Sequence, residues 1–366
     1  MHVDRDSSVE SDRGMEKQAQ GLPTSRTSTN AKTPRPVCRL SPLMTTIPFP
    51  NGASGPRPIT VALVNNMPDS AFVDTEDQFR WTTTAALEGA TVELELYTIT
   101  EIPRSEQIAA VIASRYRGLD QLWTRPPDAM IVTGTEPTQP QLRFEPYWPY
   151  LARLLEWAAN SVPTTLLSCL AAHASILLFD GIERMRLPVK CSGVFGGSIE
   201  DRSDPLARGL PRVVPVPHSR LNGVPASTMI DAGYRIVIGS GRAEGGWAVA
   251  ARKQGQGMFV LCQSHPEYGT LSLLREYRRD VRRCLFGRGT MPYPRVPDGY
   301  LRPKALATLQ RFERQVAVAG TDARELWARF PYDEVAPTVE NTWAPASALL
   351  YRNWLRFADA TLPLAA

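Results

Sequence analysis

The sequence predicts an α/β fold in which helices flank a mostly parallel sheet, followed by a C-terminal appendage. Short apolar, partly β-branched runs alternate with segments of helical character between residues 59 and 285. Runs of this kind are typical of buried parallel strands, and their alternation with helices is typical of α/β domains. The 366 residues, of which 43% are hydrophobic and 21% charged, are enough to bury a large core.

The first part of the chain differs in composition from the rest. Residues 1–57 are rich in Ser, Thr, Pro, Arg and Asp, and the stretch 24–36 has almost no large apolar side chain. Because such a segment cannot bury enough apolar surface to fold, we predict a disordered N-terminal extension. We expect the α/β domain over residues 58–290 and a C-terminal segment, 291–366, packed on its core.

The predicted strands are short apolar runs. The first, Ile59–Val64, is broken by the polar residues 65–70, and alternation in the second, Val92–Ile99, places Val92, Leu94 and Leu96 on one face. The other predicted strands are Ala129–Thr133, Thr164–Ser168, Tyr234–Ile238, Trp247–Ala251 and Met258–Gln263.

Helical segments are expected between these strands. They are Asp74–Glu88, Ser105–Ser114, Tyr150–Ala159, a helix that starts after Cys169, and Leu271–Leu285. The C-terminal segment opens with the proline-broken residues 291–297 and continues with a helical pattern over Ala305–Arg314. It is too small and too broken to fold alone.

Composition and charge exclude several classes of protein. No run approaches the roughly 18 apolar residues of a membrane span, and the N-terminus lacks the apolar centre of a secretory signal. The net charge of +4, from 41 basic and 37 acidic residues, is too small and too scattered to indicate nucleic acid. We therefore expect a cytoplasmic protein that binds neither membrane nor nucleic acid. The five cysteines show no CxxC pair and no zinc spacing, so we expect free thiols and no metal.

Three polar groups follow strands of the predicted sheet, at the edge where open parallel sheets bind ligands. They are residues 133–135, 168–170 and 264–268. The second group contains Cys169 and the third contains His265. We therefore expect this cysteine and this histidine to share one edge of the sheet.

Cys169 opens a predicted helix. A helix N-terminus favours a thiolate and supplies free backbone N–H groups. The N–H of Leu170, together with one from Gly134 or Thr135, would bind a developing oxyanion. The alternative interpretation is an ordinary buried cysteine at a strand–helix turn.

His265 and Glu267 lie two residues apart with a proline between them, so extended backbone points both side chains to one side. Glu267 would accept the Nδ1–H of His265 and leave Nε2 facing the thiol, as in a catalytic triad. The alternative is a surface turn. His173 is a rival base, but it would look along the helix of Cys169, and we favour a packed or solvated histidine there.

Glu276 and Arg279 lie three residues apart, hence on one face of a predicted helix. An exposed ion pair is the common interpretation of this spacing. The functional interpretation is a clamp for a free amino acid, in which the fork of Arg279 holds the carboxylate and Glu276 holds the ammonium.

A series of segments, in a fixed order, extends over most of the chain from Ile59 to Phe357. They are Asn66-Met-Pro68, Thr75-Glu76 with Gln78-Phe79, Ile131-Val-Thr-Gly134, Tyr147-Trp148-Pro149, Leu154-Leu-Glu-Trp157, Lys190-Cys-Ser-Gly-Val194, Pro217-His-Ser-Arg220, His265-Pro-Glu-Tyr268, Arg279-Asp-Val281, Trp343 and Asn353-Trp-Leu355. In this order and spacing the chain resembles the homoserine O-acyltransferases of the class I glutamine-amidotransferase-like fold. The resemblance implies a flavodoxin-like three-layer sandwich and the first committed step of bacterial methionine synthesis.

The resemblance also implies roles for individual residues. Cys169 corresponds to the acyl-accepting nucleophile, His265 to the general base and Glu267 to its partner. The substrate-binding residues correspond to Lys190, Ser219 and Arg279. The implied mechanism is ping-pong: acyl-CoA acylates the cysteine, and the hydroxyl of L-homoserine then takes the acyl group. Acyl-CoA is a co-substrate, no bound cofactor or metal is needed, and a homodimer is compatible with the sequence.

The loop that selects the acyl group in this family corresponds to residues 138–143. A glutamate there goes with acetyl donors, whereas Thr138 stands near the equivalent position and is neutral. A carboxylate would repel a succinyl tail, so its absence removes an obstacle, and Arg143 would pair with the tail. We therefore expect an O-succinyltransferase.

Several alternatives stay open at this point. Leu170 stands where the family commonly has Trp, and Asp69 and Ser70 stand where it commonly has basic residues. An acetyl donor and L-serine as acceptor therefore remain alternatives. Serine differs from homoserine by one methylene, which contributes only about 1–3 kcal/mol to the discrimination between two substrates. Two further alternatives are a glutamine amidotransferase-like hydrolase and a non-catalytic binding paralogue. Against the hydrolase, Leu167 and Ala171 replace the glycines that usually flank the cysteine.

Overall fold

A computed structural model of the chain describes residues 57–87, 91–241, 246–287, 292–317 and 322–359. The chain divides into two units, residues 1–53 and 54–366, and the described residues all belong to the second unit. The predicted disordered extension, residues 1–57, lies outside the described residues apart from Arg57, and it stays a prediction.

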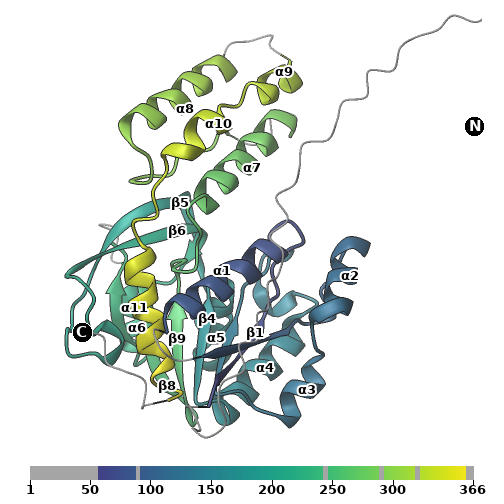
Figure 1. Ribbon diagram of the computed structural model, residues 1–366, viewed down its shortest axis with the longest axis vertical. Coiled ribbons are helices and arrows are strands. Elements are labelled where there is room, and N and C mark those ends of the chain that lie inside the picture. The colour runs from purple at the N-terminus through teal and green to yellow at the C-terminus, as the bar shows by residue number, and fades with distance from the viewer. Residues whose placement is uncertain (1–56, 88–90, 242–245, 288–291, 318–321, 360–366) are drawn as a thin grey trace, which may run out of the picture. The chain divides into compact units, whose positions relative to one another are not determined.

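The described residues form a seven-stranded central sheet (Figure 1). Five parallel strands lie side by side in the order β2-β1-β3-β4-β9. They are β1 (Ile59–Val64), β2 (Val92–Tyr97), β3 (Ala129–Val132), β4 (Thr164–Ser168) and β9 (Gly257–Cys262). Two antiparallel strands, β8 (Trp247–Gln254) and β7 (Arg235–Gly239), extend the edge beyond β9. The predicted mostly parallel sheet is confirmed.

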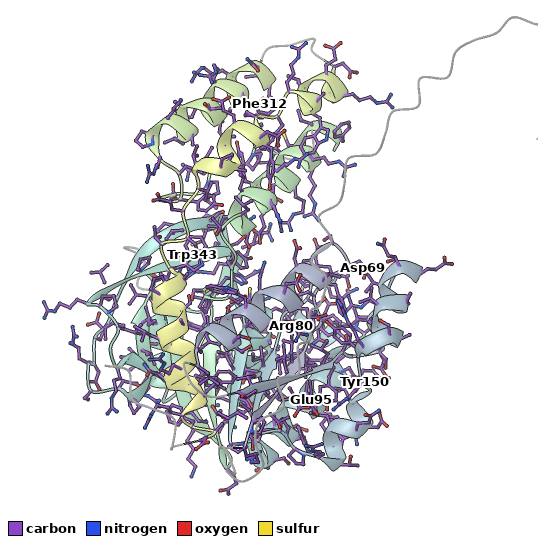
Figure 2. All side chains as sticks on the ribbon, viewed as in Figure 1. Asp69, Arg80, Glu95, Tyr150, Phe312 and Trp343 are labelled. Carbon is purple, nitrogen blue, oxygen red and sulfur yellow. The ribbon has the colours of Figure 1, made fainter. Side chains whose placement is uncertain are left out.

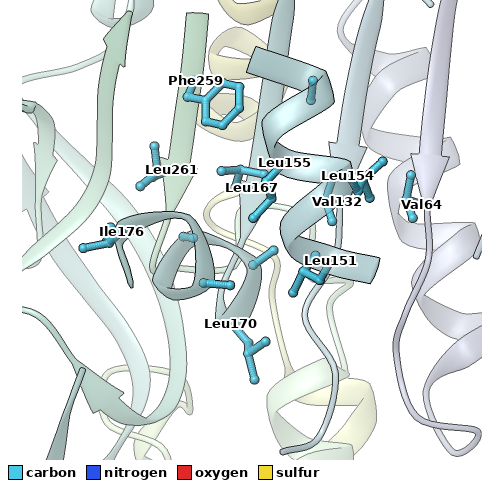
Figure 3. Packing of buried hydrophobic residues seen from close by; sticks show 14 of the residues in the cluster. Val64, Val132, Leu151, Leu154, Leu155, Leu167, Leu170, Ile176, Phe259 and Leu261 are labelled. Atoms are coloured by element: carbon cyan, nitrogen blue, oxygen red, sulfur yellow. The ribbon is translucent and has the colours of Figure 1, made fainter. Parts of the chain in front are cut away.

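Helices cover both faces of this sheet, which explains why β1, β3 and β4 are buried at every residue. One apolar cluster packs β4 through Leu167 against α3 (Leu119–Thr124), α4 (Trp148–Ser161), α5 (Leu170–Asp180) and α6 (Ala226–Asp231) (Figure 3). The next residue on the strand towards the N-terminus, Leu166, faces the opposite cluster, which contains α1 (Phe72–Ala85) and α11 (Ala344–Leu355). Alternate residues of a strand thus pack into two separate apolar clusters, one on each face of the sheet.

Most predicted elements are present, with ends displaced by a few residues. α4 begins two residues earlier than predicted because Pro149 fits the first turn of a helix. α2 (Glu106–Arg115) begins after Ser105, whose hydroxyl accepts a hydrogen bond from the N–H of Ile108. Three short 3₁₀ turns complete this part of the fold: Leu142–Phe144, Pro205–Ala207 and Ala336–Thr338. No helix in the described ranges has the length and apolarity to cross a membrane.

A two-stranded antiparallel sheet, β5 (Met185–Ser198) and β6 (Val213–Gly223), lies outside the central sheet and was not predicted. Its three prolines and several glycines resemble a loop in sequence. The glycines have a packing reason. A Cβ on Gly193, for example, would lie 2.3 Å from the carbonyl oxygen of Asp298, which runs alongside β5.

The residues after β9 pack in two places. α7 (Ser272–Phe286), α8 (Pro303–Val316), α9 (Ala323–Ala328) and α10 (Tyr332–Val335) share an apolar cluster that includes Phe312 and Trp343 (Figure 2). α11 leaves this cluster and packs on the central sheet (Figure 1). The C-terminal segment therefore contributes to both bodies of apolar side chains, and the predicted boundary at residue 290 stays a prediction.

We expect Trp354→Ala to lower the free energy of unfolding by about 3–5 kcal/mol, because the Trp354 side chain is completely buried between α11 and the sheet. Urea denaturation followed by circular dichroism measures this loss. Ile230→Ala is the control, because Ile230 is 58% exposed and its loss should change stability by no more than about 0.5 kcal/mol. Equal effects of the two substitutions would contradict the described packing of α11.

Candidate active site

Cys169 has a strained backbone at the junction of β4 and α5. Its φ is 52° and its ψ is −106°, and it is the one non-glycine residue of positive φ within the described ranges. Its N–H donates to the carbonyl of Cys262 at 2.7 Å, and its carbonyl accepts from the N–H of His173 at 3.2 Å. Such a conformation costs about 1–3 kcal/mol and persists only where its surroundings fix it. The sharp turn sets the thiol at the N-terminus of α5.

His265 lies between Glu267 and Cys169. Its Nδ1–H donates to Oε1 of Glu267 at 2.8 Å, and its side chain also hydrogen-bonds to Cys169. The backbone N–H of His265 donates to the carbonyl of Pro217 at 2.8 Å, which ties the loop after β9 to β6. The hydroxyl of Ser168 donates to the same oxygen of Glu267 at 3.1 Å. The structure thus brings the predicted nucleophile, base and orienting carboxylate together.

The charges in this group favour a protonated histidine. Burial by itself lowers the pKa of His265, but the carboxylate of Glu267 and the neighbouring Cys169 raise it by more. The pKa of His265 therefore lies well above its ordinary value. An imidazolium next to the sulfur is the environment in which a cysteine acts as a nucleophile.

The backbone groups predicted to bind an oxyanion lie beside the thiol. A Cβ on Gly134 would meet the backbone nitrogen of Leu170 at 3.1 Å, so the two residues are in contact. Leu170 is the first residue of α5, where an N–H has no acceptor within the helix. The hydroxyl of Thr133 donates to the carbonyl of Gly134 at 3.0 Å and fixes this loop, which continues into the half-buried Thr135.

Tyr268 connects the histidine to a charged cluster on α7. Its ring stacks on the His265 imidazole with centroids 4.2 Å apart and an interplanar angle of 18°. Its hydroxyl donates to Oε1 of Glu276. The hydroxyl of Ser219, on β6, donates to the other oxygen of Glu276. The predicted ammonium ligand therefore lies one side chain away from the base.

Two cations complete this cluster. Nζ of Lys190 lies 3.5 Å from Oε2 of Glu276 and 2.7 Å from Oδ2 of Asp280. Nη2 of Arg279 lies 4.0 Å from the same Glu276 oxygen, and Nε lies 3.2 Å from Oδ1 of Asp280. The four residues predicted to bind substrate, Lys190, Ser219, Glu276 and Arg279, thus surround one another.

The cluster keeps both signs of charge. Burial raises the pKa of Glu276, but Lys190 and Arg279, aided by hydroxyl donors, bring it below its ordinary value. Burial lowers the pKa of Arg279, but Glu276 and Asp280 bring it above its ordinary value. An adjacent carboxylate and guanidinium suit a zwitterionic amino acid, whose ammonium and carboxylate need opposite partners.

The loop predicted to select the acyl group is held by Glu145. Oε1 of this side chain accepts from the N–H groups of Thr138 at 2.6 Å and Gln139 at 2.7 Å, and Oε2 accepts from the Thr138 hydroxyl at 2.9 Å. Arg143 is exposed and pairs with Glu183 at 3.2 Å. Thr138 therefore lies on an ordered loop, while Arg143 already has a counter-ion at the surface.

The other histidines of the described chain are structural. His173 is 3% exposed and pairs with Oε1 of Gln263 at 3.0 Å, and burial lowers its pKa to about 4. This is a packed helix histidine, as favoured above. His218 lies in β6 and is fully buried beside the ring of Phe195.

A cavity of about 370 Å³ reaches the triad only through Glu267. Its lining comes from α1, including Asp74, Asp77 and Trp81, from the loop 269–271 and from the first turn of α7. Neither Cys169 nor His265 lines it. The chemistry predicted for the thiol therefore lies outside this cavity.

Sequence reasoning gave no role to several residues that the structure places at the site. Tyr268 directly follows the His265-Pro-Glu267 segment, which was the available signal for it. Ser168 precedes the cysteine in the same way. Asp280 lies within the segment Arg279-Asp-Val281, which was the signal for it. Glu145 and Arg184 carry no local signal, because their roles depend on contacts between distant segments.

Comparison with known sequences identifies similar proteins. The sequence model of a family described as homoserine O-succinyltransferase matches residues 53–361. A homoserine O-succinyltransferase from Bradyrhizobium japonicum is 41% identical over 306 residues, which cover 83% of this chain and 91% of the relative. Another from Methylorubrum extorquens is 40% identical over 321 residues, which cover 86% of this chain and 93% of the relative.

Solved structures of glutamine amidotransferases resemble the chain more distantly. One from Thermotoga maritima has a TM-score of 0.42 and 13% identity, and covers 83% of this chain and 99% of its own. One from Methylobacillus flagellatus has a TM-score of 0.44 and 13% identity, and covers 84% and 96%.

We expect Glu267→Gln to lower the pKa of His265, because the Glu267 charge is the largest of the influences that raise it. A raised pKa keeps His265 protonated up to a higher pH. When the pKa falls, a smaller fraction of His265 is an imidazolium near neutral pH. An NMR titration of labelled histidine measures this pKa, and the rate of the enzyme reaction should fall by about 10²–10⁴-fold. Ser168→Ala is the control, since it removes a neutral donor to the same carboxylate oxygen. A titration of His265 unchanged in Glu267→Gln would refute the described pairing.

Proposed function

The chain belongs to the homoserine O-succinyltransferase family, and we propose that it transfers the succinyl group of succinyl-CoA to the hydroxyl of L-homoserine. The observation that carries this proposal is the contact of Cys169 with His265, itself paired with Glu267, at the end of β4. This arrangement suits acyl transfer through a covalent thioester.

The first half-reaction acylates the cysteine. The thiolate of Cys169 attacks the thioester carbonyl of succinyl-CoA, and the carbonyl oxygen becomes an oxyanion. The N–H of Leu170 and an N–H from Gly134 or Thr135 would hold this oxyanion. The bond to the CoA sulfur then breaks, the CoA thiolate takes the proton of the His265 imidazolium, and neutral His265 faces a succinylated Cys169.

The second half-reaction transfers the acyl group. His265 Nε2 takes the hydroxyl proton of homoserine, and the oxygen attacks the new thioester. The bond to the Cys169 sulfur breaks and restores the thiolate beside the imidazolium. Glu267 holds Nδ1–H throughout, so that Nε2 stays aimed at the reacting oxygen.

The charged cluster on α7 would hold the amino-acid end of the acceptor. The carboxylate of Glu276, with its pKa lowered, accepts hydrogen bonds from an ammonium, and the part-exposed guanidinium of Arg279 donates to a carboxylate. Lys190 and Ser219 hold Glu276 in place. Because Tyr268 stacks on His265 and bonds Glu276, the acceptor's hydroxyl would extend toward the base.

The two half-reactions need no bound metal or redox cofactor, since Cys169 and His265 supply both the nucleophile and the proton transfers. We place the enzyme in the cytoplasm, where its substrates are made, and a homodimer stays a prediction.

We expect Cys169→Ala to form no covalent adduct with succinyl-CoA and to lose at least about 10³-fold in the rate of CoA release. Intact-protein mass spectrometry after mixing with succinyl-CoA, without acceptor, detects the adduct. Cys284→Ala, which removes a thiol on α7, should keep both the adduct and the rate. An adduct that persists in Cys169→Ala would eliminate this cysteine as the nucleophile.

For the unaltered protein, we expect the fastest CoA release with succinyl-CoA and homoserine together. Acetyl-CoA replaces the donor and L-serine the acceptor in a two-by-two comparison of kcat/KM. Faster turnover with acetyl-CoA would contradict the proposed donor, and faster turnover with serine would contradict the proposed acceptor.

A further inference from the structure

Arg184 is a half-buried cation that interacts electrostatically with the nucleophile and has no bonded counter-ion among the described residues. It immediately precedes β5, is half-buried, and interacts electrostatically with Cys169 and Tyr147 and with two carboxylates, those of Glu145 and Glu183. Within the described part of the chain, its guanidinium makes no hydrogen bond or ion pair. Burial lowers the pKa of Arg184 by more than these neighbours raise it. A partly desolvated guanidinium of this kind is stabilised when an anion binds to it.

Tyr147 supplies a second donor at the same place. Its side chain is 5% exposed, and its hydroxyl is buried with no hydrogen-bond partner among the described residues. The hydroxyl interacts electrostatically with Arg184 and Glu145. A buried hydroxyl without a partner destabilises the protein, and this cost disappears if the hydroxyl donates a hydrogen bond to a ligand oxygen.

The acidic groups nearby already have partners. Glu145 accepts three hydrogen bonds from Thr138 and Gln139, so both of its oxygens are occupied. Glu183 pairs with Arg143 at the surface. Neither carboxylate is bonded to Arg184, and the guanidinium is left for a ligand.

We propose that Arg184 and Tyr147 form the subsite for the free carboxylate of the succinyl group while its thioester carbon lies at Cys169. The guanidinium fork binds the carboxylate, and the Tyr147 hydroxyl donates to one of its oxygens. This inference rests on the proposed function and adds the residues that favour succinyl over acetyl. An acetyl group has no carboxylate and leaves both donors unpaired. A buried polar site discriminates against a substrate that lacks its hydrogen-bonding partner in this way.

The subsite replaces one expectation with another. Arg143 was expected to pair with the succinyl tail, but it is exposed and already bound to Glu183. Arg184 is more deeply buried and interacts electrostatically with the nucleophile. The neutral Thr138 remains part of the explanation, because its hydroxyl and N–H hold the charge of Glu145 in place.

The experiment compares kcat/KM for CoA release from succinyl-CoA and acetyl-CoA, with homoserine saturating. Arg184→Ala should lower the value for succinyl-CoA by about 10–100-fold and change the value for acetyl-CoA by less than about threefold. Tyr147→Phe should lower the succinyl value by about 3–10-fold with the same selectivity. Arg186→Ala removes an exposed arginine of the same type two residues along and should leave the donor ratio unchanged.

Several outcomes would overturn the subsite. They are an unchanged donor ratio in both Arg184→Ala and Tyr147→Phe, an equal loss with both donors in both variants, or a ratio that falls in Arg143→Ala and not in Arg184→Ala. If Arg184→Ala does not fold, the ratio in Tyr147→Phe decides. A parent protein that releases no CoA from succinyl-CoA would overturn the proposed function itself. An active parent whose donor ratio is unchanged in both variants would overturn the subsite alone.

Discussion

The backbone at Cys169 is the constraint on which the site depends. A residue with a side chain is held at positive φ where β4 turns into α5, and bonds to Cys262 and His173 fix it there. Residues on either side of Cys169, Leu167 on β4 and Leu170 on α5, are packed in one apolar cluster. The strain is carried by the surrounding packing, because β4 is buried at every residue and α5 is buried along most of its length. The central sheet therefore serves first as a rigid support for one sulfur atom.

The second organising feature is a continuous line of polar contacts. It runs from Glu267 through His265 to Cys169, and from His265 through the ring of Tyr268 to Glu276. The loop after β9 supplies the central members of this line, while β6 and α7 supply the far end. The base and the charged cluster are consequently held by the same short loop. Displacing Tyr268 would disturb the stacking on one side and the Glu276 carboxylate on the other.

Local patterns in the sequence were sufficient for the strands of the central sheet, because buried parallel strands are compact and apolar. The same patterns predicted the longer helices around it, but not the six-residue helices α3 and α6. They also placed residues 169, 265 and 267 at one sheet edge, since parallel strands end together. The β5–β6 pair escaped prediction because its prolines and glycines have the composition of a loop, and its glycines are explained only by Asp298 and other distant backbone. Arg143 and Arg184 could not be ranked from sequence, since burial and the pairing with Glu183 separate them. What sequence lacked was information on contacts between segments far apart in the chain.

The indole of Trp343 donates to the carbonyl of Tyr268 at 2.8 Å and belongs to the same apolar cluster as that residue. The loop that carries the histidine is thus held by a side chain that lies 75 residues later in the sequence. During synthesis on the ribosome, Cys169, His265 and Glu267 therefore emerge well before Trp343. An unfinished polypeptide would hold its sulfur and imidazole without this hydrogen bond to the loop of the histidine.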